Sequence, residues 1–343
     1  MQTKRDSLIS LILEKIAIAT LRPGDPVPSR NQLARKYNIS YVTVDKALRY
    51  LTDSGHLTAV RGSGTFVAPP KTASWSPVNR IYSIFHSFSY FNLNLGSVIQ
   101  NDLDFPVVFN NIDDTDSSLY FPEFLRAGAG VVWYYPFISR IYLMDMLKRA
   151  GVPMLLLNRD YGDFDCIMTD AHASLREGIS WLLEEGGRNF ALIYARQGTA
   201  APYRASRIIA AYENLADFGI SLSPENVYPM THLYDPEELS SVAYRIFLQK
   251  KMPRCIVLLD SEIAVSLITI GMTMGKKPGE DYFLLTFDND PQLAQFRGVG
   301  MLEQMLSLFC MEAKKFFFST SIDRSKPFRK YIKAELIFGG RNT

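Results

Sequence analysis

The sequence predicts an α/β protein composed of a small helical N-terminal domain and a larger domain built on parallel sheets. Three observations support this prediction. Residues 1–68 show three amphipathic helical patterns followed by a glycine-rich hairpin. Residues 78–343 alternate continuous apolar strands with amphipathic helices, which is typical of parallel sheets covered on both faces. The segment 69–77 between them is rich in proline and small polar residues, as expected of a linker.

Composition and charge agree with a folded chain of two parts. Of the 343 residues, 47% are hydrophobic and 21% are charged, so both parts are large enough to bury a core. Residues 1–70 contain ten Lys and Arg against five Asp and Glu, a net charge of +5, whereas the whole chain carries only +2. A basic domain joined to a slightly acidic one is typical of a nucleic-acid-binding protein with a separate second module.

The cysteines and the hydropathy indicate a reducing compartment. Cys166, Cys255 and Cys310 are odd in number and far apart, so we expect buried free thiols rather than disulfides or a zinc site. No segment reaches the ~18 uncharged apolar residues that a membrane helix needs, and no signal-peptide pattern is present. We therefore expect a cytoplasmic protein that does not contact a membrane.

The first 40 residues predict two helices. Apolar residues between Leu8 and Ala19 fall on one helical face, and the Pro-Gly-Asp-Pro sequence of 23–26 ends that helix. A second, short helix begins after Ser29, which can form a reciprocal cap with Gln32.

A third helix and a hairpin complete the N-terminal domain. Ser40 can cap a helix whose apolar residues between 44 and 51 repeat at helical spacing. Two short strands, 57–60 and 65–67, flank the glycine-rich tip 61–64. The tip is not a phosphate-binding loop, because it lacks the third glycine of a dinucleotide fingerprint and leads into a strand instead of a helix. The pattern predicts a winged helix-turn-helix.

A set of residues between 21 and 67 carries a family resemblance. It consists of 21–29 (Leu-Arg-Pro-Gly-Asp-Pro-Val-Pro-Ser), 32–34, 39–40, 43–44, 46–48, Leu51, Gly55 and 61–67 (Arg-Gly-Ser-Gly-Thr-Phe-Val). These residues resemble the GntR family of bacterial transcription regulators. The resemblance implies that the third helix enters the major groove of DNA and that the glycine tip of the wing enters the minor groove. Only glycine lets a backbone come this close to a groove floor.

The resemblance also indicates which residues contact DNA. They are Ser29, Arg30, Asn31, Ser40, Tyr41, Thr43, Lys46, Arg49, Arg61, Gly62 and Gly64. Three positions depart from the family, which usually has arginine where this chain has Asn31, Tyr41 and Asp45. The operator consensus of the family is therefore not carried over. Any single Lys or Arg of the set is equally explained as a solvated surface charge.

The larger domain is predicted from alternating strands and helices. The strands are 81–85, 107–109, 130–133, 154–157, 166–169, 190–194, 255–259 and 283–287, and the helices are 141–150, 173–185, 204–218, 236–249 and 262–274. In parallel sheets of this kind, ligands bind at the carboxyl ends of the strands.

Several short motifs of this domain carry a second resemblance. They are 170–182, Gly-Gly-Arg at 186–188, 191–193, Arg207 followed by Gly219, Leu-Leu-Asp at 258–260 with Ala264, and Phe-Asp-Asn at 287–289. Together they resemble the periplasmic-binding-protein-like effector domain of LacI-type regulators. The resemblance covers nearly all of 78–343 and implies two α/β subdomains that close on a small molecule, most often a sugar, between them.

The resemblance and the positions after strand ends suggest an effector site. Arg207, Asp260 and Asp288 are the polar candidates carried over from the family. Position alone adds Phe85, His86, Phe88, Tyr134, Tyr135, Arg159, Asp170 and Tyr203. Sugar hydroxyls need the bidentate contacts that Asp and Arg provide, and an apolar sugar face needs an aromatic ring. Two alternatives stay open: Asp260 caps the next helix, or Tyr134 and Tyr135 belong to the core.

Two other chemistries are not supported. The acidic segment 113–118 lacks the glycine and the bidentate glutamate of a calcium loop, so we expect a solvated loop. His56, His86, His172 and His232 have no metal-ligand spacing, and no nucleophile motif occurs. We therefore expect no metal, no cofactor and no enzymatic activity.

The two resemblances together imply a ligand-responsive bacterial transcription regulator, an arrangement similar to the arabinose-responsive regulators. Its partners would be operator DNA, a second copy of the chain in a homodimer, and a small molecule, most simply a monosaccharide that controls a repressor. The sequence leaves open whether the effector releases or promotes DNA binding. The alternatives are a constitutive DNA binder whose large domain only dimerises, and a sugar-modifying enzyme.

Overall fold

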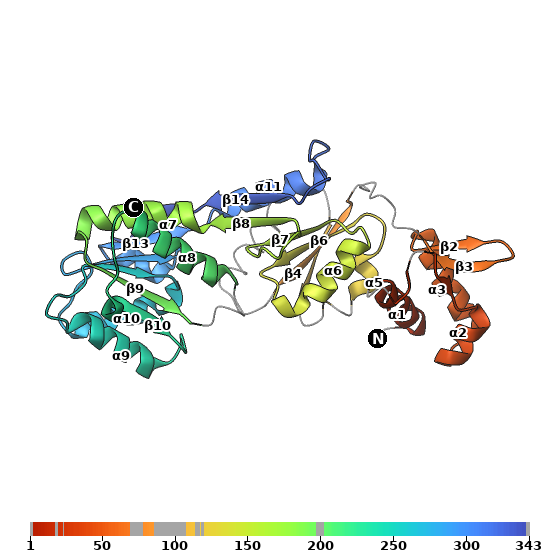
Figure 1. Ribbon diagram of the computed structural model, residues 1–343, viewed down its shortest axis with the longest axis horizontal. Coiled ribbons are helices and arrows are strands. Elements are labelled where there is room, and N and C mark those ends of the chain that lie inside the picture. The colour runs from red at the N-terminus through yellow and green to blue at the C-terminus, as the bar shows by residue number, and fades with distance from the viewer. Residues whose placement is uncertain are drawn as a thin grey trace. The chain divides into compact units, whose positions relative to one another are not determined.

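A computed structural model describes residues 3–17, 20–22, 24–68, 78–85, 108–113, 117, 120–196 and 202–340. The chain forms two compact units (Figure 1). The first consists of residues 1–167 and 310–329, and the second of residues 168–309 and 330–343. The predicted linker 69–77 lies outside the described residues, so the boundary between domains 1–68 and 78–343 stays a prediction.

The N-terminal elements of the first unit form a winged helix-turn-helix. They are α1 (Lys4–Ala17), β1 (Pro26–Val27), α2 (Arg30–Tyr37), α3 (Tyr41–Asp53), β2 (Leu57–Val60) and β3 (Gly64–Val67). The predicted capping box between Ser29 and Gln32 is present, and Ser40 caps α3. The apolar face of α3 is buried, and so are residues of α1 and α2. The buried side chains include Val44, Leu48 and Leu51 of α3, Leu8 and Ile12 of α1, and Leu33 of α2.

One strand of this domain was not predicted. The two-residue strand β1 pairs antiparallel with β3, so the small sheet has the order β1-β3-β2. Its sequence, Pro-Val, carries no strand pattern of its own. The strand forms because β3 offers an unpaired edge at which a proline is tolerated.

The rest of the first unit is built on a six-stranded sheet of order β14-β8-β7-β6-β4-β5, and the boundary with the second unit falls within β8, after residue 167, and within β14, after residue 329. The strands are β4 (Arg80–Phe85), β5 (Val108–Asp113), β6 (Ala129–Tyr134), β7 (Met154–Leu157), β8 (Cys166–Asp170) and β14 (Arg329–Lys333). Strands β5, β4, β6, β7 and β8 are parallel, as predicted. The helices are α5 (Phe121–Phe124), α6 (Ile141–Arg149) and α11 (Leu306–Phe318), and a short η2 (Ile138–Arg140) precedes α6.

Helix α11 packs its aromatic residues against this sheet. Phe316 and Phe317 are buried, and a Cβ atom at Gly130 of β6 would lie 2.8 Å from the Phe317 ring. Helix α11 is not among the helices that the sequence predicted. The acidic segment 113–118 begins at the end of β5, and most of it lies outside the described residues.

The second unit contains a six-stranded sheet of order β10-β9-β11-β12-β13-β15. The strands are β9 (Phe190–Ala195), β10 (Val227–Met230), β11 (Cys255–Leu258), β12 (Phe283–Phe287), β13 (Val299–Glu303) and β15 (Glu335–Phe338). The first five strands of that order are parallel, and β15 is antiparallel to β13. Strands β10, β13 and β15 were not predicted.

Helices cover both faces of this sheet. They are α7 (Ala171–Gly186), α8 (Pro202–Asp217), α9 (Pro236–Phe247) and α10 (Ala264–Thr273), with short η3 (Pro224–Asn226), η4 (Ser261–Ile263) and η5 (Pro291–Gln295) between strands and helices. One core cluster joins the sheet to α7 and α8, and the other joins it to α9 and α10. The predicted parallel sheet with two covered faces is therefore confirmed.

Three further expectations concern the described residues. Among them, no helix is long and apolar enough to cross a membrane. The described part of the chain also contains no group of three His, Cys, Asp or Glu placed to hold a metal ion. Cys166, Cys255 and Cys310 are buried free thiols, as predicted.

Candidate nucleic-acid interface and effector site

The N-terminal end of α3 is built as an exposed helix tip. The Ser40 hydroxyl accepts a hydrogen bond from the Thr43 backbone N–H at 3.2 Å, which starts the helix directly after the turn. Tyr41 and Val42 in the first turn are 52% and 60% exposed. Free backbone N–H groups at such a tip favour phosphate.

A carboxylate on α3 holds two of the predicted DNA-contacting arginines. One oxygen of Asp45 lies 2.7 Å from Arg30 Nε of α2, and the other lies 2.9 Å from Arg49 Nε one turn further along α3. The hydrogen bond from Arg30 and the positive charges of Arg49 and Arg30 lower the pKa of Asp45. From the sequence, Asp45 was known only as a position at which the chain departs from the family. The structure shows that it pairs with two arginines.

The wing tip is open around its glycines. Gly62 and Gly64 have φ values of +80° and +124°, and a Cβ atom at either would meet nothing within 4 Å. Their positive φ values explain why glycine stands there. All eleven predicted DNA-contacting residues are exposed or half-buried, and they lie at the starts of α2 and α3, along α3 and at the wing tip.

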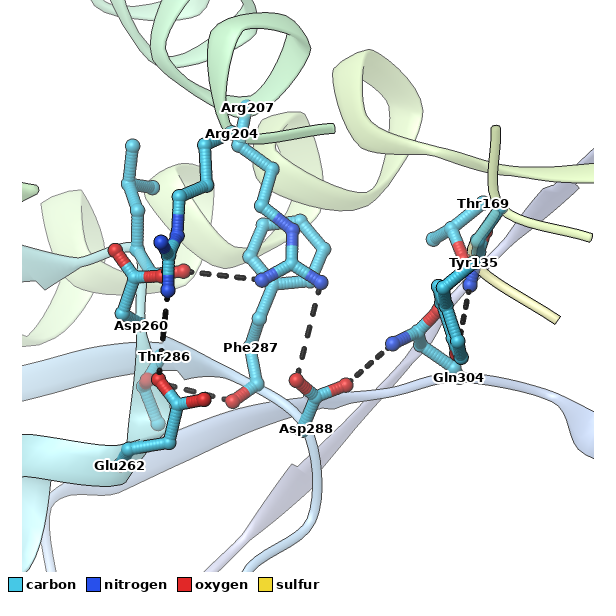
Figure 2. Close-up of polar contacts among 12 residues, drawn as sticks. Tyr135, Thr169, Arg204, Arg207, Asp260, Glu262, Thr286, Phe287, Asp288 and Gln304 are labelled. Carbon is cyan, nitrogen blue, oxygen red and sulfur yellow. Dashed lines mark hydrogen bonds and ion pairs between the residues drawn. The ribbon is translucent and has the colours of Figure 1, made fainter. Parts of the chain in front are cut away.

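In the second unit, Arg204 and Asp260 form a buried ion pair at the carboxyl end of β11 (Figure 2). Arg204 Nε donates to Asp260 Oδ1 at 2.7 Å, and the Ala195 backbone N–H donates to Asp260 Oδ2 at 3.2 Å. Asp260 is only 3% exposed, and its side chain makes no capping bond to the following η4. The alternative that Asp260 only caps a helix is therefore wrong.

Arg207 is fixed one helical turn from Arg204 on α8. Its guanidinium lies 3.8 Å from the Phe287 ring centroid and 5.0 Å from that of Tyr203. Its Nη1 donates to the Leu259 carbonyl at 3.1 Å, and its Nη2 lies 3.8 Å from Asp288 Oδ2. The arginine is thus buried between aromatic rings, with one edge directed at a carboxylate.

Asp288 follows β12 in the left-handed region, at φ +67°. Its other carboxylate oxygen accepts a hydrogen bond from Gln304, whose side-chain oxygen accepts one from Thr169 (Figure 2). This chain of hydrogen bonds orients the carboxylate. The predicted residues Tyr203, Arg207, Asp260 and Asp288 are therefore brought together at the carboxyl end of one sheet.

Two members of this cluster were missed by the sequence analysis. Arg204 lies three residues before Arg207, a spacing that places both on one face of α8. Glu262, two residues after Asp260, lies 3.9 Å from Arg204 Nη2. Loss of solvation and the negative charge of Asp260 raise the pKa of Glu262.

In the first unit, a second polar cluster follows β6 and β7. Tyr135 and Asn158 are both left-handed, with φ values of 51° and 53°, and Asn158 Nδ2 donates to the Tyr135 hydroxyl at 3.2 Å. The Arg159 guanidinium lies 5.0 Å from the Tyr135 ring centroid and donates to the Asn158 carbonyl at 2.7 Å. Asn158 was missed by the sequence analysis.

The remaining predicted effector residues are placed differently. Tyr134 is 2% exposed within β6, and burial raises the pKa of its hydroxyl, so it belongs to the core of the first unit rather than to a binding surface. Asp170 caps α7 by accepting the Ala173 backbone N–H at 2.9 Å. Phe85 is the last residue of β4. His86 and Phe88 lie outside the described residues.

The comparisons with known proteins agree with both halves of the structure. Residues 4–67 match the model of the family described as bacterial regulatory proteins, gntR family. The solved regulator CelR in complex with cellobiose has a TM-score of 0.59 to this chain at 13% identity, covering 91% of this chain and 98% of that one. The Lac repressor dimer bound to operator and the anti-inducer ONPF has a TM-score of 0.60 at 13% identity, covering 77% and 94%.

Residues 4–67 are therefore a GntR-type DNA-binding domain, and the rest of the chain has the fold of LacI-family regulators. The chain is also similar to the arabinose metabolism transcriptional repressor of Halalkalibacterium halodurans, 22% identical over 311 residues that cover 84% of this chain and 81% of that one. The histidine utilization repressor of Klebsiella aerogenes is 46% identical over 63 residues, 18% of this chain. That match covers 26% of the repressor's own length.

Proposed function

We propose that this protein is a homodimeric bacterial repressor that acts in the cytoplasm and whose affinity for operator DNA is controlled by a monosaccharide. The observation that carries the proposal is the cluster of Arg204, Arg207, Asp260, Glu262 and Asp288 in the second unit. Guanidinium and carboxylate groups beside aromatic rings are what recognition of vicinal hydroxyls requires.

The known proteins with similar folds support a sugar effector. The arabinose metabolism repressor has a name that refers to a sugar, and CelR was solved with cellobiose. A LacI-family regulator from Weissella paramesenteroides was solved with glucose and with sucrose. A homodimer is proposed because one winged helix contacts too few base pairs to be selective.

The charges of the cluster favour a neutral sugar. In the second unit, the two guanidinium groups of Arg204 and Arg207 are accompanied by the three carboxyl groups of Asp260, Glu262 and Asp288. A phosphate or a carboxylate on the ligand would add negative charge where carboxylates already exceed arginines. We therefore propose an uncharged pentose or hexose rather than a sugar phosphate or sugar acid.

A thermal-shift panel on the full chain tests this function. It compares arabinose, xylose, glucose and galactose with glucose 6-phosphate and glucuronate. A bound sugar at about 100 times its dissociation constant adds about 2.7 kcal/mol of stability. Stabilisation by a neutral sugar supports the proposal, whereas a response only to the charged compounds contradicts the assigned class. No response to any sugar favours a constitutive DNA binder.

A further inference from the structure

The tip of the recognition helix α3 is apolar where a charged residue would be expected. Tyr41 and Val42 are adjacent in its first turn and are 52% and 60% exposed. The other exposed large apolar side chain among the described residues of 3–68 is Val60, at the base of the wing. Ser40 fixes where the helix starts, so Tyr41 and Val42 occupy its first two positions.

Two of the four predicted cationic DNA contacts, Arg30 and Arg49, already have an ion-pair partner. Asp45 binds Arg30 and Arg49 through their Nε atoms, one on each carboxylate oxygen. A guanidinium held in this way keeps Nη donors for phosphate oxygens, and turning its fork onto the edge of a guanine requires its pair with Asp45 to break. The first turn of α3 therefore presents an exposed phenol ring and an isopropyl group, beside the polar side chains of Ser40, Thr43 and Lys46.

We propose that this helix tip recognises thymine. Tyr41 and Val42 pack against the C5-methyl groups of thymines in the major groove, while Asp45 positions Arg30 and Arg49 on the DNA backbone. The thymine methyl is the apolar feature that base pairs present in that groove, so it is the group that an exposed valine and tyrosine ring complement. The inference rests on the proposed DNA-binding function and adds to it the class of base that is read.

The test removes only the methyl group. Binding sites are first selected with the full-length protein from a random duplex library, and each thymine of the selected site is then replaced by deoxyuridine. Burial of a methyl group corresponds to about a fourfold change in affinity. We expect replacement of one or two thymines in each half-site to lower the affinity by about this factor. Replacement of the other thymines should leave the affinity unchanged.

Two variants connect the effect to the helix tip. We expect Val42→Ala and Tyr41→Ala to bind the thymine duplex more weakly than the unaltered protein does. At the position that each side chain contacts, replacing thymine by deoxyuridine should then cause no further loss of affinity. Tyr244→Ala is the matched control, because Tyr244 of α9 has the same exposed fraction of 52% but lies in the second unit. This control keeps the full penalty for deoxyuridine.

The outcomes separate this inference from the function on which it rests. If a site is selected but no deoxyuridine replacement weakens binding, the thymine contact is wrong and the DNA-binding function stands. The same conclusion follows if both alanine variants keep the penalty. If no sequence is enriched at all, the proposed function itself fails.

Discussion

At the scale of single residues, Asp288 is the position at which effector recognition is most directly tested. It follows β12 at φ +67°, a region that asparagine also tolerates. Asp288→Asn keeps the shape and the backbone but removes the negative charge beside Arg207. Because hydrogen bonds to charged groups contribute about 1.5–3 kcal/mol, we expect sugar affinity to fall at least about tenfold. Isothermal titration calorimetry measures this loss.

The control for that variant is two residues away. Asp290 caps η5 by accepting the Gln292 backbone N–H, and asparagine caps equally well. Asp290→Asn should therefore bind sugar as the unaltered protein does. If both variants bind equally, the placement of Asp288 in the effector site is wrong.

Cys255 provides a test of burial at the same scale. Its thiol lies 3.1 Å from the Leu182 carbonyl, and burial raises its pKa to about 12. The folded state therefore keeps the thiol protonated at pH values where the unfolded chain ionises, so this contribution to stability is present below about pH 8.5 and is lost as the pH rises further. At pH 8, Cys255 should react with a thiol reagent only after denaturation, which mass spectrometry of labelled peptides detects. Labelling of this residue in the native protein would show that the packing is wrong.

At the scale of elements, the turn before β13 depends on a glycine. Gly298 has φ +73°, and a Cβ atom there would lie 2.2 Å from the Gly279 backbone nitrogen. Gly298→Ala combines left-handed strain with overpacking against backbone that cannot rotate away, so we expect a loss of about 2–5 kcal/mol in the free energy of unfolding. Urea denaturation measures this value.

Gly275 provides a control that separates backbone strain from overpacking. It has a similar φ of +75°, but a Cβ atom there would meet nothing within 4 Å. Gly275→Ala should therefore lose only about 1–2 kcal/mol from backbone strain. Equal losses for the two variants would mean that the close approach of the two turns does not contribute.

Two strands of the second unit, β10 and β13, were not predicted because each contains a residue that is unfavourable in a strand. β10 contains Pro229, which argues against a strand unless it lies at a sheet edge, and the sheet order places β10 there. β13 contains Gly300, which weakens a strand pattern but is required because Trp181 lies 2.7 Å from the position of its Cβ atom. Whether each segment forms a strand therefore depends on neighbouring residues that are distant in sequence.

At the scale of the whole molecule, effector and operator must influence one another equally. If a sugar changes operator affinity, then operator DNA changes sugar affinity by the same factor, typically 5- to 150-fold for couplings of about 1–3 kcal/mol. Titration of the selected sugar into the protein, with and without a saturating operator duplex, measures the factor. A duplex of scrambled sequence is the control. Identical sugar affinities under the two conditions would refute effector control and leave a constitutive DNA binder.

The sequence by itself determined the class of this protein. Capping residues, helical periodicity and a glycine tip lie close together in the chain, so the winged helix could be recognised from local pattern alone. The parallel sheets could be recognised because continuous apolar strands are buried on both faces whatever their order. Asp260 and Asp288 were identified because short motifs around them resemble those of LacI-type regulators.

Only the tertiary structure decided which side chains meet. The sequence left Tyr134 and Tyr135 as equal candidates. In the structure Tyr134 is buried at the end of β6, whereas Tyr135 follows the strand at φ +51° and lies beside Arg159. Arg204 of α8 pairs with Asp260 across 56 positions of the chain, and Asp45 of α3 binds Arg30 of α2. Such pairings depend on how elements pack, and no local pattern of residues specifies them.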